Sequence, residues 1–192
     1  RCGRAKSHGW FFFSCYNTEQ ANTLLEVNDP GIMIECLNAY RLKEKLPSNL
    51  LNYRVALGVP EIIKEGTDLT IVSYGATLRI AHEAAVLLDA MGISCEVIDV
   101  QTLLPFDINS SILDSLKKTS RIIFADEDLP GGAAAYMFNM VMEIQGGYRW
   151  LDVAPRTITA QPHRPAYGTD GDYFSKPNVE DIINVVKEMM SE

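Results

Sequence analysis

After residue 59, short apolar runs alternate with amphipathic helical segments, and no other feature of the sequence limits the possible folds so strongly. The apolar runs are rich in β-branched residues and predict strands at residues 68–74, 94–100, 121–125 and 156–160. Helical patterns follow these strands, at residues 76–91, 108–118, 132–144 and 179–190. Strands that alternate with helices form a parallel sheet covered on both faces, through right-handed crossovers. We therefore predict an α/β fold, a doubly wound three-layer α/β/α sandwich.

The first part of the chain follows a different pattern. A short helix is predicted at residues 19–28 and a strand at residues 31–37, and the charged and then polar stretch 41–52 is typical of a linker. A further short strand is predicted at residues 59–64, just before the alternating region. Residues 1–17 show no clear periodicity, so we assign no element to them.

Charge and composition exclude several classes of function. The net charge of −8 argues against nucleic-acid binding, because proteins of that class concentrate Lys and Arg to neutralise phosphates. No apolar run approaches the ~18–20 residues that a membrane helix needs, and the start of the chain does not resemble a secretory signal. The four cysteines form no C-x-x-C pair. This predicts a reducing, cytoplasmic location, with no zinc site and no disulfide framework.

Candidate binding residues lie where the predicted strands end, because ligands of open α/β sheets bind at the carboxyl ends of the strands. They are Gly75, Thr77, Asp126, Glu127, Gly131 and Gly132. The helix start after the first strand would present amides to an anion, whereas the acidic run 126–128 would shift a carboxyl pKa or hold a cation. The alternatives are a tight turn at Gly75 and capping of the next helix by the acidic residues. No glycine-rich phosphate-binding motif is present, so we treat the set as an anion or interface site.

No catalytic group of residues emerges from the sequence. His82 lies on the polar side of a predicted helix, His163 lies in a loop after the last strand, and His8 lies in the unassigned segment. Residues 168–172 resemble the start of a magnesium–thiamine diphosphate motif, but their order differs and the paired Asn is absent, so we predict a turn. The catalytic residues are therefore unknown, and no metal or cofactor site is predicted in this chain.

Residues 67–107 resemble the C-terminal domain of transketolase-like enzymes, and most of all that of the beta subunits of branched-chain 2-oxo acid and pyruvate dehydrogenases. The motifs that match are the strand–glycine–helix unit at 68–75, EVIDVQTLLPFD at 96–107, the strand with acidic residues and a glycine pair at 122–132, and the helix start at 177–182. Residues 28–35 resemble the last strand of the pyrimidine-binding domain that precedes this domain in the family.

The resemblance implies a five-stranded, mostly parallel sheet whose first strand, at residues 59–64, is antiparallel. It divides the chain into a remnant of the thiamine pyrimidine-binding domain at 1–40, a linker at 41–58 and a transketolase C-terminal-like domain at 59–192. The implied activity is oxidative decarboxylation of a 2-oxo acid, with acyl transfer to a lipoyl group. Thiamine diphosphate and magnesium belong to the whole enzyme. We expect neither to bind this chain alone, and we expect the isolated chain to be inactive.

The implied partners are a dehydrogenase alpha subunit or domain, a second beta subunit, and the basic peripheral subunit-binding domain of a lipoyl acyltransferase. Acidic residues near the C-terminus would meet that basic domain. The candidates are Asp170, Asp172, Glu180, Asp181, Glu188 and Glu192. A solvated acidic tail is the alternative interpretation. Two further functions stay open: the C-terminal domain of a transketolase or deoxyxylulose-phosphate synthase, and a free-standing binding or oligomerisation module.

Overall fold

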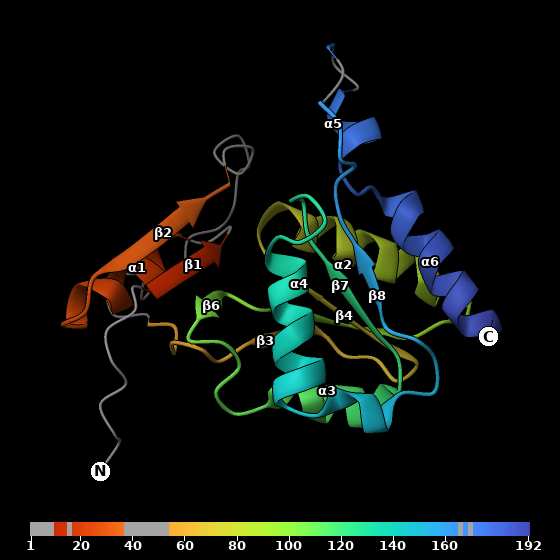
Figure 1. The fold of residues 1–192 in the computed structure, drawn as a ribbon, viewed down its shortest axis with the longest axis horizontal. Coiled ribbons are helices and arrows are strands. Elements are labelled where there is room, and N and C mark those ends of the chain that lie inside the picture. Colours follow the sequence, from red (N-terminus) through yellow and green to blue (C-terminus); the bar gives the residue numbers. More distant parts are fainter. Residues whose placement is uncertain (1–9, 15–16, 37–53, 165–166, 169–170) are drawn as a thin grey trace.

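The fold was analysed in a computed structural model (Figure 1), which describes residues 10–14, 17–36, 54–164, 167–168 and 171–192. Only residues 54–58 of the predicted linker fall within these ranges, so the linker and the domain boundaries stay predictions.

Five strands form the central sheet. Their order is β3 (Glu61–Lys64), β5 (Cys95–Asp99), β4 (Leu69–Ser73), β7 (Ile122–Ala125) and β8 (Arg156–Ile158). Strand β3 pairs antiparallel with β5, while β5, β4, β7 and β8 are parallel to one another. The predicted sheet, including its antiparallel first strand, is therefore confirmed. Every residue of β4, β5 and β7 is buried, as expected for strands covered on both faces.

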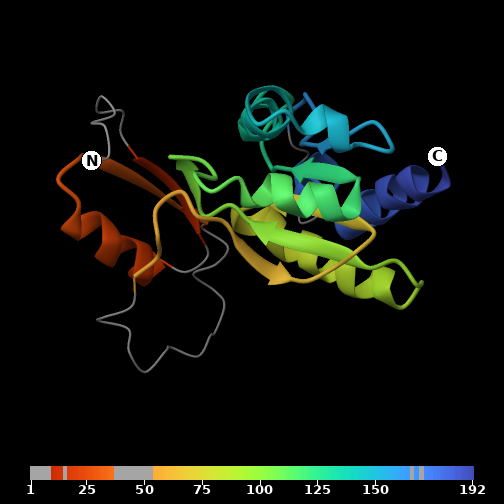
Figure 2. The same ribbon diagram turned by 90° about the horizontal axis from the view of Figure 1, so that it is seen from below.

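Helices cover both faces of this sheet (Figure 2). On one face, α2 (Gly75–Asp89) and α6 (Val179–Ser191) pack together and contribute to one apolar cluster. On the other face, α3 (Ser111–Thr119) and α4 (Ala133–Phe138) contribute to a second cluster. The predicted helix at 132–144 changes from α to π geometry at η2 (Asn139–Ile144). The three-layer sandwich is confirmed.

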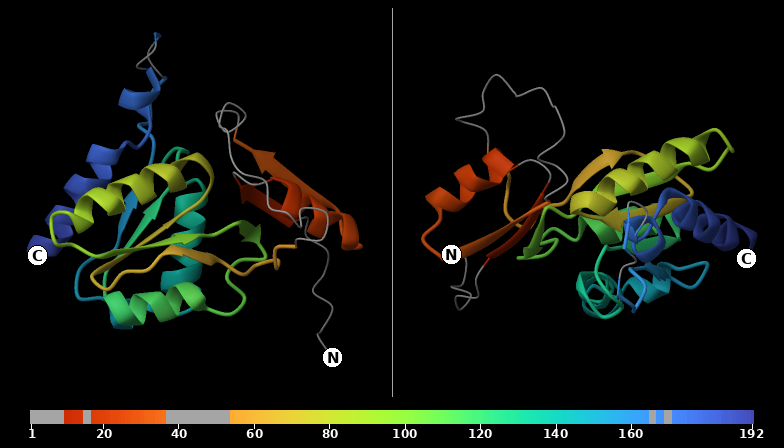
Figure 3. Two further views of the ribbon diagram at one scale, coloured as in Figure 1. Left: turned by 180° about the vertical axis from the view of Figure 1, so that it is seen from behind. Right: turned by 90° about the horizontal axis from the view of Figure 1, so that it is seen from above.

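The N-terminal part forms a second, smaller sheet with a strand from the main domain. Strands β1 (Trp10–Ser14) and β2 (Gly31–Glu35) are parallel and are linked by α1 (Asn17–Glu26). Strand β6 (Thr102–Leu104) pairs antiparallel with β1, which gives the order β2–β1–β6. Figure 3 shows β6 reaching from the main domain to this small sheet. Neither β1 nor β6 is predicted by the sequence patterns.

Two short helices also differ from the sequence-based predictions. Helix α5 (Gly171–Ser175) includes the last two residues of the stretch that we expected to form a turn, so the turn prediction is wrong for Gly171 and Asp172. The 3₁₀ helix η3 (Gly147–Trp150) lies in a segment with no predicted element. Helices of four or five residues complete barely one turn, so they leave no periodic pattern in the sequence.

Candidate functional site

Two residues meet where the neighbouring strands β4 and β7 end. Tyr74 follows β4 and Asp126 follows β7, and the Tyr74 hydroxyl donates a hydrogen bond to Asp126 Oδ1. The chain leaves β4 toward β5 on one side and leaves β7 toward β8 on the other. This is the topological switch point, where ligands of doubly wound sheets bind. Here a tyrosine and an aspartate from the protein itself occupy it.

Asp126 accepts hydrogen bonds from two backbone amides as well. The amide of Asp128 donates to Oδ1 at 3.1 Å, and the amide of Ala134, in the first turn of α4, donates to Oδ2 at 3.0 Å. Asp126 is buried, and its carboxylate therefore holds the start of α4 in place. Burial, and then the hydrogen bond to Asp126, raise the pKa of the Tyr74 phenol well above its ordinary value, so the phenol stays protonated.

The predicted residues Gly75 and Thr77 lie at the start of α2. Gly75 has φ +57°, in the left-handed region that favours glycine. A Cβ atom there would lie 3.1 Å from Cys36 Sγ, so the residue after β2 lies close against this helix start. Thr77 is buried. The turn predicted at Gly75 is therefore present. The anion or interface site at this position stays a proposal.

The other predicted residues lie in the loop between β7 and α4. Glu127 is exposed and accepts a hydrogen bond from Lys176 Nζ at 3.2 Å, which links this loop to the junction of α5 and α6. Gly131 has φ +97°, and a Cβ atom on Gly132 would lie 2.6 Å from Asp128 Oδ2. The structure thus brings Tyr74, Gly75 and Asp126 together, whereas Glu127 and Gly131 lie in the exposed loop.

A second buried carboxylate, which the sequence analysis did not single out, lies toward the opposite end of the sheet. Glu96 in β5 is fully buried, and it accepts hydrogen bonds from Ser115 Oγ and Lys118 Nζ. The amide of Gly66 also approaches it, at 3.4 Å. Burial would raise the pKa of Glu96, but the hydrogen bonds from Lys118 and Ser115 outweigh burial and lower the pKa overall. An acidic residue in the interior of a strand predicted to be buried was the available clue, because a buried carboxylate needs partners.

Asp107 lies between β6 and α3, and its carboxylate also has a structural role. Its Oδ1 accepts hydrogen bonds from the amide and the hydroxyl of Ser111, at 2.8 and 2.7 Å. Its Oδ2 accepts from the amide of Ile112 at 3.1 Å and from Gln145 Nε2 at 3.2 Å. Asp107 therefore fixes the start of α3.

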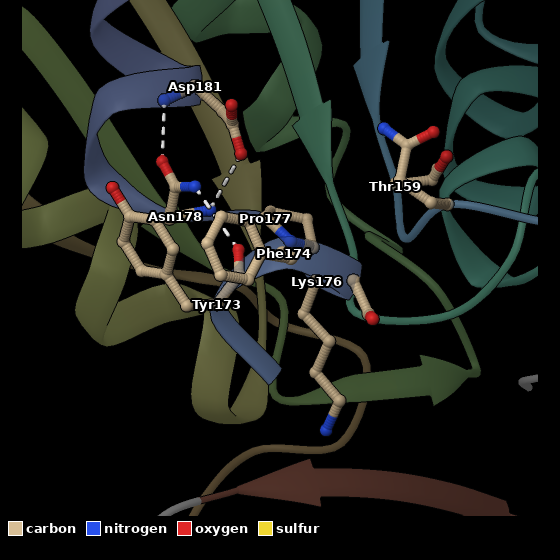
Figure 4. Close-up of a pocket in the computed structure, with 9 residues that line it drawn as sticks. Thr159, Tyr173, Phe174, Lys176, Pro177, Asn178 and Asp181 are labelled. Carbon is tan, nitrogen blue, oxygen red and sulfur yellow. Dashed lines mark hydrogen bonds between the residues drawn. The ribbon is translucent and has the colours of Figure 1, made fainter. Parts of the chain in front are cut away.

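The acidic residues proposed for docking lie around α5 and α6. Asp172, Glu180, Asp181 and Glu188 are exposed, Glu192 forms an ion pair with Arg156 at 2.7 Å, and Asp170 lies outside the described residues. Figure 4 shows a pocket of about 170 Å³ beside them, lined by residues such as Thr159, Phe174, Lys176 and Asp181.

Asp181, which lines that pocket, is already hydrogen-bonded within the protein. Its carboxylate accepts a hydrogen bond from the backbone N–H of Asn178 at 3.1 Å, and its own backbone N–H donates to Asn178 Oδ1 at 2.9 Å. The two residues form a capping box at the start of α6.

The histidines and cysteines form no reactive group in the part of the chain that is described. His82 and His163 are both exposed and lie on separate elements, and His8 falls outside the described ranges. Cys36 and Cys95 form no disulfide. Within the same ranges, no group of three or more His, Cys, Asp or Glu is placed to hold a metal ion. No helix among these residues is both long and apolar enough to cross a bilayer.

Comparisons with known proteins indicate the family of this chain. A family described as "Transketolase, C-terminal domain" matches residues 58–178. The pyruvate dehydrogenase E1 component subunit beta of Acholeplasma laidlawii is 31% identical over 170 residues, which are 86% of this chain and 50% of that protein. The acetoin:2,6-dichlorophenolindophenol oxidoreductase subunit beta of Bacillus subtilis is 33% identical over 171 residues, which are 88% and 48% of the two chains. The chain thus spans about half the length of these relatives.

Among solved structures, an inactive beta4 tetramer of a split-gene transketolase superposes with a TM-score of 0.67 at 20% identity. The match covers 95% of this chain and 57% of that one, and it supports the fold. The family match extends over most of the chain and includes β3 to β8 of the central sheet. The chain therefore belongs to the transketolase C-terminal domain family.

Proposed function

We propose that this chain is the C-terminal part of the beta half of a thiamine-diphosphate-dependent 2-oxo acid dehydrogenase. The observation that carries the proposal is the sequence identity over nearly the whole chain. The dehydrogenase and oxidoreductase beta subunits are 31% and 33% identical over 86% and 88% of the chain. The split-gene transketolase covers a similar share of the chain but is only 20% identical. The reaction of the whole enzyme would be oxidative decarboxylation of a 2-oxo acid, with acyl transfer to a lipoyl group.

Within that enzyme, we assign this chain to assembly rather than to cofactor binding. The switch point is occupied by Tyr74 and Asp126, and the adjoining loop presents the carboxylates of Glu127 and Asp128. Lys176 pairs with Glu127, but the carboxylates of Asp126 and Asp128 add further negative charge that a diphosphate would meet. The described residues therefore do not fit thiamine diphosphate with its magnesium ion. Both would bind where the alpha half meets the remainder of the beta half, and this chain alone would bind neither.

The exposed acidic residues of α5 and α6 suit a basic partner. Asp172, Glu180 and Glu188 are exposed on this side, in a chain whose net charge is −8. Opposite charge accelerates the encounter with a basic domain and favours it over acidic competitors. We propose that this surface binds the peripheral subunit-binding domain of the lipoyl acyltransferase. We further propose that the chain packs against a second beta subunit and the alpha half.

The test uses the tagged chain as bait in a lysate of its source, with bound proteins identified by mass spectrometry. We expect a thiamine-binding dehydrogenase half and a lipoyl acyltransferase. Assays of 2,6-dichlorophenolindophenol reduction by the recovered assembly, with pyruvate, branched-chain 2-oxo acids or acetoin, would then name the substrate. Titration calorimetry of the chain alone with thiamine diphosphate and Mg²⁺ should show no binding. Tight binding, or ketose transfer instead of dye reduction, would contradict the proposal.

The docking surface has its own test. The double variant Glu180→Gln and Glu188→Gln should weaken binding of the recovered acyltransferase and reduce the salt dependence of its affinity. The control neutralises two exposed acidic residues elsewhere, Glu83 on α2 and Asp152 after η3. Equal weakening by both double variants would show that only net charge matters, and would remove the assignment of this surface.

A further inference from the structure

The Tyr74–Asp126 hydrogen bond crosses the switch point and connects two segments that are distant in sequence. Both side chains are buried, and the residues lie 52 positions apart. The bond joins the start of α2 to the end of β7. A buried hydrogen bond to a charged group is among the stronger single contacts in proteins. This bond therefore restricts movement of the start of α2 and of the loop that follows β7.

On the α2 side, the constrained position is the start of α2, where the end of β2 from the N-terminal sheet lies against it. Gly75 follows Tyr74 directly, and its backbone lies so close to Cys36 that a Cβ atom would be 3.1 Å from the sulfur. Cys36 is the residue after β2, the outer strand of the small sheet. Movement of Tyr74 therefore moves the surface that the end of β2 contacts.

On the β7 side, the constrained position is the loop from Glu127 to Gly132. Asp126 accepts the amide of Asp128 within this loop and the amide of Ala134 just after it. The loop projects into solvent with Leu129 48% exposed. Its shape therefore depends on where the Asp126 carboxylate lies.

We propose that Tyr74 and Asp126 are positioning residues. They couple the contact between the end of β2 and the start of α2 to the conformation of the 127–132 loop. Contacts run without a break from Cys36 through Gly75, Tyr74 and Asp126 to the loop. The pair does not touch substrate or cofactor in this account. Through this pair, a shift of the N-terminal sheet changes the conformation of the 127–132 loop, and a change in the loop shifts the sheet. Contiguous contacts between two such segments allow this coupling.

The variant Tyr74→Phe tests the coupling, because it removes one oxygen and leaves the ring in place. Asp126 keeps its two amide donors, so the chain should still fold. The matched control is Tyr148→Phe, which also removes a hydroxyl bound to a carboxylate, that of Glu143 at 3.1 Å, but on η3 at the surface.

Two readouts follow the two sides of the pair. Hydrogen exchange measures opening of the 127–132 loop, and the rate of reaction with a thiol reagent measures access to Cys36. Cys2 and Cys15 are replaced by Ser in all variants. Burial raises the pKa of Cys95 to about 12, so this thiol stays protonated and unreactive at pH 8.

We expect Tyr74→Phe to raise both the loop exchange rates and the Cys36 reaction rate by on the order of tenfold, and Tyr148→Phe to change neither. The reverse experiment attaches a bulky reagent to Cys36 in the unmodified Tyr74 background. Because coupling is reciprocal, loop exchange should rise there too. The proposal is overturned if only one readout changes, if neither does, or if exchange rises uniformly over the whole domain.

Discussion

The buried carboxylate of Glu96 gives the sharpest stability prediction, through the substitution Lys118→Met. Lys118 Nζ bonds to Glu96 Oε2, and it also reaches Glu65 at 3.3 Å on the surface. Methionine is an unbranched side chain one atom shorter than lysine, and it removes the charge. The variant therefore leaves a fully buried carboxylate with Ser115 and the distant Gly66 amide as its donors.

The magnitude follows from the exposure of the two partners. Removing one partner of a fully buried ion pair costs about 3–5 kcal/mol. The Lys118 side chain is 40% exposed while that of Glu96 is not exposed at all, so water partly replaces the lost ammonium. We expect a loss of about 1.5–3 kcal/mol in the free energy of unfolding. Lys117→Met is the matched control. Lys117 is also 40% exposed, but it pairs with Asp114, which is 68% exposed, so its loss should stay below about 1 kcal/mol.

Urea unfolding of Lys118→Met, Glu96→Gln and the double variant measures the pairwise term directly. With Gln at position 96 no buried charge is left unpaired, so adding Lys118→Met should then cost far less than it does alone. The pH dependence has a defined sign. Because the pKa of Glu96 is lowered in the folded chain, its carboxylate contributes stability above the unfolded pKa of about 4.3, and this is lost as pH falls through the folded pKa.

In the Lys118→Met variant, burial is no longer outweighed by the ammonium and the pKa of Glu96 rises. The deficit relative to the unmodified chain should then be largest near neutral pH and should shrink as the pH falls, first through the raised pKa of Glu96 in the variant and then through its lowered pKa in the unmodified chain. Equal losses for Lys117→Met and Lys118→Met would refute the reasoning. So would a deficit for Lys118→Met that grows as the pH falls.

Four further substitutions, each followed by urea unfolding, test other parts of the fold. Gly66→Ala would place a Cβ atom on the backbone at the start of β5 and should cost more than about 4 kcal/mol, whereas Gly92→Ala, with open space but φ +82°, should cost about 1 kcal/mol. Asp107→Ala removes the acceptor for two amides, a hydroxyl and an amide side chain, and should cost about 2–3 kcal/mol. Asn178→Ala breaks the capping box of α6 and should cost about 1 kcal/mol, which equal stability of variant and parent would contradict.

Local periodicity was sufficient to predict the parallel strands of the central sheet and the helices that cover them, whereas the antiparallel pairing of β3 was expected from the family resemblance. The predicted strand at 68–74 contains β4, whose five residues are all buried, and the prediction for the last helix, 179–190, ends one residue before α6 does. Strands β1 and β6 could not be predicted in this way. Strand β1 lies between β2 and β6, and β6 pairs with β1 and has three residues, too few to show a period. Pairing between residues that are 90 positions apart leaves no local mark in the sequence.

The candidate site was located by a topological rule, but its interactions were not. The rule that strand ends gather functional residues pointed to Gly75 and Asp126, and the structure brings these two residues near each other through Tyr74. Tyr74 was assigned to the preceding strand, and its bond to Asp126 joins residues that only the folded sheet brings together. Glu96 was likewise hidden in a strand, although Ser115 and Lys118, three positions apart on one helix face, were placed to meet it.

The buried carboxylates of Asp126 and Glu96 share a property that bears on function. Asp126 near the carboxyl ends of the strands and Glu96 near their amino ends each accept hydrogen bonds from three donors of the protein. A general acid or base needs an oxygen that can reach a substrate proton, directly or through one water. These oxygens instead hold loops and helix ends. These two buried charges therefore maintain the shape of the domain, which is what the assembly role that we propose for it requires.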